Sequence, residues 1–160
     1  MIARLVRVAL LLSAAVLMWV FVATAQSTDP FVGTWRLNVA KSTYSPGPAP
    51  KSITTIYEAA GKGYKVGVTN ESATGKTQYG YTTNLDGKES TVTGTNANAD
   101  TLTVKRIDAG TLEVVSRRAG KVTVTQRNVL SADGKTRTVT TTGTDAQGQK
   151  IHNVAVFEKQ

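Results

Sequence analysis

Cysteine is absent from this 160-residue sequence, and histidine occurs once, as His152. The lack of cysteine excludes a disulfide framework, a thiol nucleophile and any zinc or iron–sulfur site with a Cys ligand. With a single histidine, one chain cannot assemble a multi-histidine metal centre, and a Ser-His-Asp triad would have to be built around His152. The sequence therefore predicts no cofactor.

Catalytic and nucleotide-binding motifs are lacking as well. The Gly-containing segments are isolated and match neither a P-loop nor a dinucleotide fingerprint. General acid–base chemistry needs paired carboxylates or a poised histidine, whereas the acidic residues here lie in or beside predicted turns or on the solvated faces of predicted strands. We expect a protein that is not an enzyme.

The N-terminus carries the one long apolar run. Arg4 and Arg7 precede a 15-residue apolar run, 8–22, whose one polar residue is Ser13, and the small-x-small pattern Ala23-Thr24-Ala25 follows. This order is typical of a secretory signal peptide, and a membrane-spanning helix needs about 20 apolar residues. We predict a signal peptide over 1–25, a single mature domain over 26–160, a periplasmic or extracellular location, and no stable membrane insertion after cleavage. An uncleaved N-terminal anchor is the alternative.

The mature chain is basic, with 17 Lys and Arg against 11 Asp and Glu, a net charge of +6. Such an excess suits nucleic acid or an anionic membrane surface when it is gathered in one place. Here the basic residues are scattered singly or in pairs, without a stripe interleaved with aromatic residues. We expect no nucleic-acid partner.

Threonine is the most conspicuous residue type, at 25 of 160, and β-branched residues favour strands. Glycines at near-regular spacing divide the chain, and Asp86-Gly87 and Asp133-Gly134 give the strongest signals for tight hairpin turns. Between the turns, apolar residues alternate with polar ones, and no window has helical periodicity. These patterns predict ten strands: 33–40, 51–59, 63–70, 77–85, 88–95, 101–107, 111–118, 121–130, 135–143 and 149–158.

A chain of hairpins can pair its last strand with its first, which removes exposed sheet edges. The predicted fold is an all-β, antiparallel up-and-down meander barrel of 8–10 strands. A β-sandwich is the alternative, and it would need a crossover between two sheets. The one connection long enough is 41–50, where Pro46, Pro48 and Pro50 exclude helix and indicate an extended segment at the barrel rim.

Both ends of the mature chain carry a resemblance to the calycins, the group of lipocalins and fatty-acid-binding proteins. Gly33-Thr34-Trp35 resembles their opening Gly-x-Trp turn, and Val156-Phe157-Glu158-Lys159 resembles the closing strand of the fatty-acid-binding branch. More narrowly, GTWRLNVAKSTYSPGPAPKS (33–52) and GTDAQGQKIHNVAVFEKQ (143–160) are similar to a group of small exported bacterial proteins of unknown function. The resemblance implies a ligand-binding barrel closed at one end by Trp35, often stacked by an arginine from late in the chain.

Two departures from the fatty-acid-binding pattern stand out. The Pro-rich segment 41–50 takes the place of the helical lid, so the sequence predicts a barrel without one. The Arg-x-Tyr carboxylate anchor of that branch falls on Ala155 and Phe157, which cannot provide it.

The predicted interior offers five candidate ligand-binding residues. Alternation along two neighbouring predicted strands places Tyr64, Tyr79 and Tyr81 on the inward face. Arg106 lies on the same face of its strand as the inward Leu102 and Val104, and Phe157 lies on the last strand. Arg106 either points inward as an anion anchor or sits at the solvated rim; Arg137, in step with Val139, is a second candidate. His152 faces outward if Ile151, Ala155 and Phe157 pack the interior, and inward, where haem ligation becomes an option, if Val154 and Val156 do.

These observations favour an exported, non-catalytic barrel that binds a small amphipathic or hydrophobic molecule. The alternative is a structural or interaction module of the cell envelope whose interior is filled. A connected cavity of a few hundred Å³ would favour binding, and filled layers of side chains would favour the module.

Overall fold

The computed structural model of the protein describes residues 29–145 and 147–160. The predicted signal peptide, 1–25, lies outside this part of the chain. Within the described residues all regular structure is β, and no helix has the length and hydrophobicity to span a bilayer. The strands are β1 (Gly33–Thr43), β2 (Ser52–Ala60), β3 (Gly63–Ser72), β4 (Gly75–Thr83), β5 (Asp86–Thr91), β6 (Thr93–Gly94), β7 (Thr101–Asp108), β8 (Thr111–Arg118), β9 (Lys121–Leu130), β10 (Thr136–Thr144) and β11 (Lys150–Lys159).

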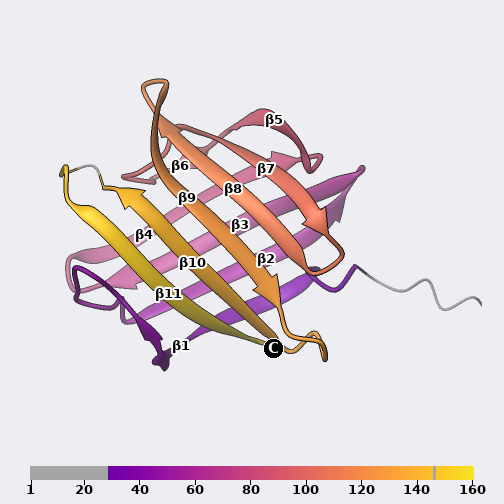
Figure 1. The fold of residues 1–160 in the computed structure, drawn as a ribbon, viewed down its shortest axis with the longest axis horizontal. Helices are drawn as coiled ribbons and strands as arrows, with labels where there is room; N and C mark the ends of the chain where they lie inside the picture. Colours follow the sequence, from indigo (N-terminus) through magenta and orange to yellow (C-terminus); the bar gives the residue numbers. More distant parts are fainter. Residues whose placement is uncertain (1–28, 146) are drawn as a thin grey trace, which may run out of the picture.

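One antiparallel sheet takes in all eleven strands, in the order β5-β7-β8-β9-β10-β11-β1-β2-β3-β4-β6. The last strand pairs with the first, as predicted, through Trp35↔Lys159 and Leu37↔Phe157. The sheet curls so that β7 to β11 cross in front of β1 to β4 (Figure 1). The predicted up-and-down barrel is confirmed, and the sandwich is not observed. The described residues form eleven strands where we predicted 8–10, because the predicted strand 88–95 is divided into β5 and β6.

The two strands that end the sheet order, β5 and β6, are consecutive in the chain. β5 pairs with β7, whereas the two-residue β6 pairs with β4 through Tyr79↔Gly94 and Gly80↔Thr93. One segment thus divides its pairing between the two edges of the sheet and nearly closes the barrel. Gly94 makes this possible: its φ is +87°, and a Cβ at that position would lie 2.4 Å from the carbonyl oxygen of Gln78.

The predicted hairpin turn at Asp86-Gly87 is wrong. β4 and β5 do not form a hairpin, the chain turns at Leu85 with φ 63°, and Asp86 and Gly87 lie at the start of β5. There they form an irregularity against β7, between Asp86↔Lys105 and Glu89↔Thr103. The turn at Asp133-Gly134 does join two paired strands, β9 and β10.

Two valines, Val39 and Val122, are exposed although the predicted alternation of apolar and polar residues places them on the inward face. Val39 is 40% exposed because the register of β1 against β11 shifts after Asn38, so strict alternation ends there. Val122 is 57% exposed at the start of β9, next to the register shift between Ser116 and Arg117 on β8. Elsewhere the predicted inward parity is confirmed.

The core is densest at the end of the barrel where β1, β3 and β8 begin, which we call the packed end. Its six largest fully buried side chains are Trp35, Tyr64, Phe31, Leu112, Val66 and Val104. The Trp35 indole nitrogen Nε1 donates a 2.8 Å hydrogen bond to the carbonyl oxygen of Phe31, so the segment before β1 is folded under the barrel. The closing role predicted for Trp35 is consistent with this position.

Candidate functional site

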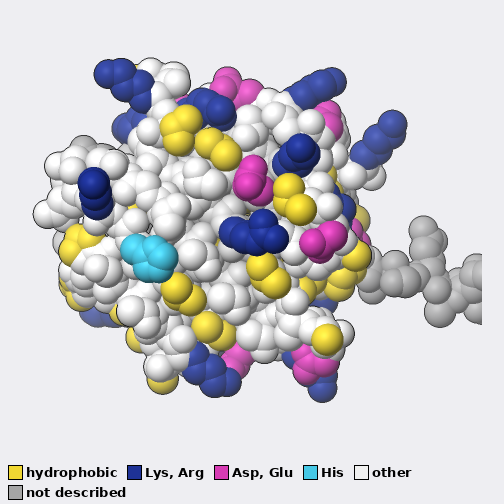
Figure 2. Space-filling model, viewed as in Figure 1, with side chains coloured by type: hydrophobic (Ala, Val, Ile, Leu, Met, Phe, Trp, Pro, Cys, Tyr) yellow, Lys and Arg dark blue, Asp and Glu magenta, His cyan; other side chains and the backbone are white. Residues whose placement is uncertain are grey.

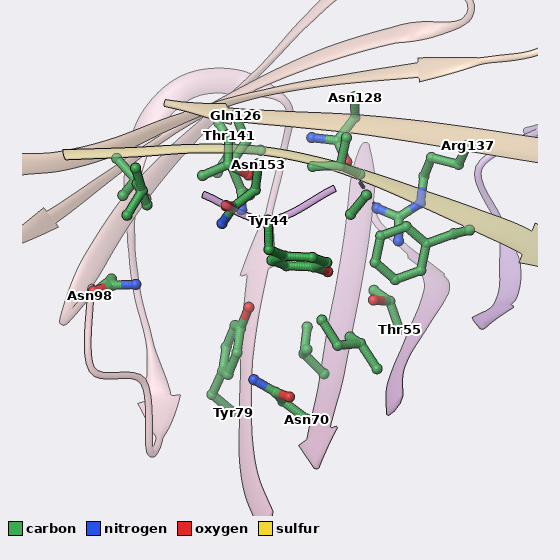
Figure 3. A pocket seen from close by; sticks show the side chains of 18 of the residues that line it. Tyr44, Thr55, Asn70, Tyr79, Asn98, Gln126, Asn128, Arg137, Thr141 and Asn153 are labelled. Atoms are coloured by element: carbon green, nitrogen blue, oxygen red, sulfur yellow. Dashed lines mark hydrogen bonds between the residues drawn. The ribbon is translucent and has the colours of Figure 1, made fainter. Parts of the chain in front are cut away.

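The opposite half of the barrel is not filled. A cavity of about 220 Å³ lies there, lined from β2, β3, β4 and β8 to β11 and by two residues outside the strands, Tyr44 and Asn98. Its aromatic lining residues are Tyr44, Tyr57, Tyr79, Tyr81 and Phe157, and its amide-bearing ones are Asn70, Asn98, Gln126, Asn128 and Asn153. Figure 3 shows these side chains converging on the space between the strands. We call this half of the barrel the cavity end.

Among the described residues, the cavity has one charged lining residue, Arg137 near the start of β10, and no lining carboxylate, lysine or histidine. Arg137 is 3% exposed. Its guanidinium carbon lies 4.3 Å from the ring centroid of Phe157, 5.2 Å from that of Tyr57 and 5.6 Å from that of Trp35. The guanidinium therefore forms the floor of the cavity, where the cavity meets the packed end, and the aromatic faces around it favour a cation.

Only one of the three guanidinium nitrogens of Arg137 has hydrogen-bond partners. Nη1 donates to the Tyr57 hydroxyl at 3.0 Å and to Asn128 Oδ1 at 2.8 Å. Nε and Nη2 are buried without a partner, and no ion pair within 29–145 and 147–160 involves Arg137. Buried charges in proteins are ordinarily paired. The site is thus equipped for an anion, since the guanidinium presents donors in a fixed fork.

The hydroxyls of Tyr44, Tyr79 and Tyr81 are neutral at ordinary pH. Burial raises the pKa of Tyr79 to about 12 and that of Tyr44 to about 12. Burial, and secondarily the neighbouring Tyr57 and Tyr79, raises the pKa of Tyr81 well above its usual value of 10. These groups remain hydroxyl donors and acceptors and add no negative charge that would oppose an anion.

The outer side of the cavity is bordered by the segment that follows β1. The backbone nitrogen of Ser45 donates to Asn153 Oδ1 at 3.0 Å, and the backbone nitrogen of His152 donates to the carbonyl oxygen of Ser45 at 2.8 Å. These bonds hold the segment against β11, and the half-buried Tyr44 enters the cavity from it (Figure 3). The extended rim segment predicted over 41–50 therefore supplies a cavity residue.

Three of the five predicted ligand-binding residues line this cavity: Tyr79, Tyr81 and Phe157. Tyr64 and Arg106 lie together at the packed end instead, where Arg106 Nη2 donates to both the Tyr64 hydroxyl and Asp29 Oδ2. The Arg106 side chain is 26% exposed. Of the two predicted orientations, Arg106 keeps inward parity but sits at the rim, and its charge is already paired.

The side chain that forms the floor, Arg137, was only our second candidate, although its parity with Val139 correctly placed it inside. Tyr57, Asn128 and Asn70 were not identified. The strand period places Tyr57 on the same face of β2 as Ile53 and Thr55, but the apolar Ile56 on the opposite face obscures that pattern. Nothing local marks Asn128 or Asn70, since a polar residue on a strand is ordinarily on the solvated face.

The one histidine of the sequence and many of the charged residues lie on the outer surface of the barrel. His152 is exposed, as expected if Ile151, Ala155 and Phe157 face inward, and it appears in cyan in Figure 2. On that face, formed by β7 to β11, basic and acidic side chains are interspersed (Figure 2). Within the described part of the chain, no three His, Cys, Asp or Glu side chains are grouped closely enough to hold a metal ion.

No protein-family model matches the sequence, and no curated protein matches it. Among solved structures, one with a similar course of the chain is zebrafish ileal bile acid-binding protein in complex with cholic acid. The two are 16% identical with a TM-score of 0.49, and the similarity covers 82% of this chain and 99% of that one. The site described above therefore rests on its own residues.

Proposed function

We propose that this protein is a non-catalytic binder that holds a small organic anion in the barrel cavity, with the anionic group on Arg137. The observation that carries the proposal is the pair of buried, unpartnered donors Nε and Nη2 of Arg137. A carboxylate can accept from both nitrogens of such a fork at once. It would supply the countercharge that the lining residues lack.

The rest of the lining supports an amphipathic ligand. Beyond the guanidinium, the cavity wall combines aromatic rings with aliphatic side chains such as Val68, Val114 and Val139. Binding sites for small molecules typically pair an apolar wall with a few placed polar groups. A cavity of about 220 Å³ favours binding over the filled structural module that was the alternative.

We further propose that the protein acts outside the cytoplasm, since its first 25 residues have the pattern of a secretory signal peptide. Sequencing the N-terminus of the protein from a cell-envelope fraction tests this directly. We expect the mature chain to begin at or near Gln26. An intact Met1 in the membrane fraction would contradict export with cleavage.

Isothermal titration calorimetry with phenylacetate and hexanoate tests the anion site, with phenylacetamide as the uncharged comparison. We expect both acids to bind and Arg137→Met to weaken them about 10- to 100-fold, because hydrogen bonds to charged groups contribute about 1.5–3 kcal/mol. The matched control is Arg127→Met, which removes the same charge from an exposed position on β9. Equal loss in both variants, or tighter binding of phenylacetamide than of phenylacetate, would overturn the proposal.

A further inference from the structure

A second buried polar atom without a partner among the described residues belongs to another residue that lines the cavity. It is the side-chain oxygen Oδ1 of Asn70, near the end of β3. Leaving a buried acceptor unpaired is energetically unfavourable. Two residues that line the cavity thus carry buried, unsatisfied groups of opposite kind: donors on Arg137 and an acceptor on Asn70.

The register of the sheet places these two groups at opposite ends of the cavity. Tyr57, which accepts from Arg137, pairs with Val66 on β3, and Asn70 lies four residues further along that strand. At about 3.3 Å per residue, four residues correspond to about 13 Å along the strand. In Figure 3, Asn70 and Arg137 lie on different sides of the space, with Thr55 between them in the view.

Aromatic side chains occupy the interval between the two ends. Tyr79 and Tyr81 line it from β4, Tyr44 enters from the rim segment, and Phe157 lies beside the guanidinium. Aromatic rings pack favourably on one another in offset or edge-to-face arrangements. The middle of the cavity thus suits a flat ring better than a flexible chain.

The volume limits how large that ligand is. An apolar protein cavity of about 150 Å³ holds one benzene molecule. At about 220 Å³, this cavity has room for one ring with a short substituent at each side. Long-chain fatty acids and steroid acids need far more space.

We infer that the ligand is a small phenolic acid: one aromatic ring with a short carboxylate arm on Arg137 and a hydroxyl that donates to Asn70 Oδ1. The inference rests on the proposed anion site and adds the ring and the donor at the other end. A short aliphatic acid would pair with Arg137 and leave the Asn70 oxygen unsatisfied. A ring acid without a hydroxyl would do the same.

Calorimetric titration of the wild-type protein with three ring acids and two chain acids tests this inference. The ring acids are 4-hydroxyphenylacetate, phenylacetate and 4-methoxyphenylacetate, whose ether oxygen cannot donate; the chain acids are hexanoate and palmitate. We expect 4-hydroxyphenylacetate to bind about tenfold more tightly than the other two ring acids, the effect of about one hydrogen bond. We also expect it to bind more tightly than both chain acids.

Asn70→Leu should remove the advantage of the hydroxyl, so that 4-hydroxyphenylacetate and phenylacetate bind this variant with equal affinity. Asn84→Leu, at an exposed position outside the cavity, is the control and should retain the full advantage. The wild-type comparison of the three ring acids does not depend on whether Asn70→Leu folds.

Failures of the inference and of the anion site can be told apart. Equal affinities for the three ring acids, or tightest binding by hexanoate or palmitate, overturn the inference. If Arg137→Met still weakens the binding of these acids about 10- to 100-fold, the anion site stands. If no acid binds the wild-type protein, both are wrong.

Discussion

The two ends of the barrel each contain an inward-facing arginine, but its guanidinium is paired at one end and partly unpaired at the other. At the packed end, Arg106 is paired with Asp29 and the Tyr64 hydroxyl. At the floor of the cavity, Arg137 keeps Nε and Nη2 without a partner. Both arginines lie at positions that the strand alternation places on the inward face. Alternation alone therefore does not distinguish an arginine that is paired within the core from one that is unpaired and can bind a ligand.

The difference comes from the chain outside the strands. Asp29 and Phe31 precede β1, and they bring a carboxylate and a ring to the packed end. The segment after β1 brings Tyr44 to the cavity end, and no acidic residue of the described part of the chain lines the cavity. The packed end is therefore electrostatically complete, whereas the cavity end carries an uncompensated positive charge.

The largest effect should follow truncation at the packed end. Trp35→Ala removes a side chain that is 0% exposed, and we expect it to lower the free energy of unfolding by about 3–5 kcal/mol through lost burial and a new cavity. Urea denaturation measures this change. Val39→Ala on the same strand is the control, since that side chain is 40% exposed and should change stability by less than about 1 kcal/mol. A loss below about 1 kcal/mol for Trp35→Ala would mean that the packed end does not carry the core.

The next effect concerns the paired arginine. Arg106→Met leaves Asp29 without its ion-pair partner, and we expect a loss of about 1–2 kcal/mol, below the full value for charged hydrogen bonds because both side chains are partly exposed. The variant Asp29→Asn should lose a similar amount. The double variant should lose less than the sum of the two, since both remove the same interaction. Additive losses would show that the two residues are not coupled.

The strands and the closure of the barrel were within reach of the sequence, and the reason is physical. Period-two alternation reports which face of a strand is buried, and tight turns require residues that tolerate positive φ. The hairpin turn predicted at Asp86-Gly87 was wrong, because this dipeptide also suits a bulge within a strand. The chain turns at Leu85 instead. Val39 was wrong because alternation cannot report the register shift that follows Asn38.

The cavity was less accessible to sequence reasoning. Whether an inward position is filled or empty depends on residues brought from distant strands, as when Asn128 on β9 and Tyr57 on β2 meet Arg137 on β10. The Asp29 partner of Arg106 comes from before the first strand, and no sequence pattern links the two. The sequence could thus predict which residues face inward. It could not predict the hydrogen bonds and ion pairs that satisfy Arg106 and leave Arg137 partly unpaired.

A third, smaller effect should appear only at alkaline pH. The unfolded chain releases the Tyr79 proton near pH 10, whereas burial holds the folded-state pKa at about 12. Between these values the unfolded state binds fewer protons, so the free energy of unfolding falls as the pH rises from 10 to 12. Tyr79→Phe should make this decline shallower in a series of urea titrations. A decline of unchanged slope would show that Tyr79 is not desolvated in the cavity.

The smallest effect on stability should come from the unpaired arginine. Arg137→Met removes a buried charge that lacks a countercharge, and it also takes two hydrogen bonds from Tyr57 and Asn128. Replacing a buried charge by an apolar side chain of similar volume is often neutral or stabilising, so the two contributions should nearly cancel and leave stability within about 1 kcal/mol of the wild type. The same substitution at Arg106 is therefore expected to be the more destabilising of the two, although Arg106 is the more exposed residue.

Urea denaturation of Arg106→Met and Arg137→Met, with and without phenylacetate, tests this difference between the packed end and the cavity end. The ligand should stabilise the wild type and Arg106→Met by mass action, but not Arg137→Met. If the free energy of unfolding of ligand-free Arg137→Met falls by several kcal/mol, the guanidinium is fully paired within the core and is not a binding site for an anion.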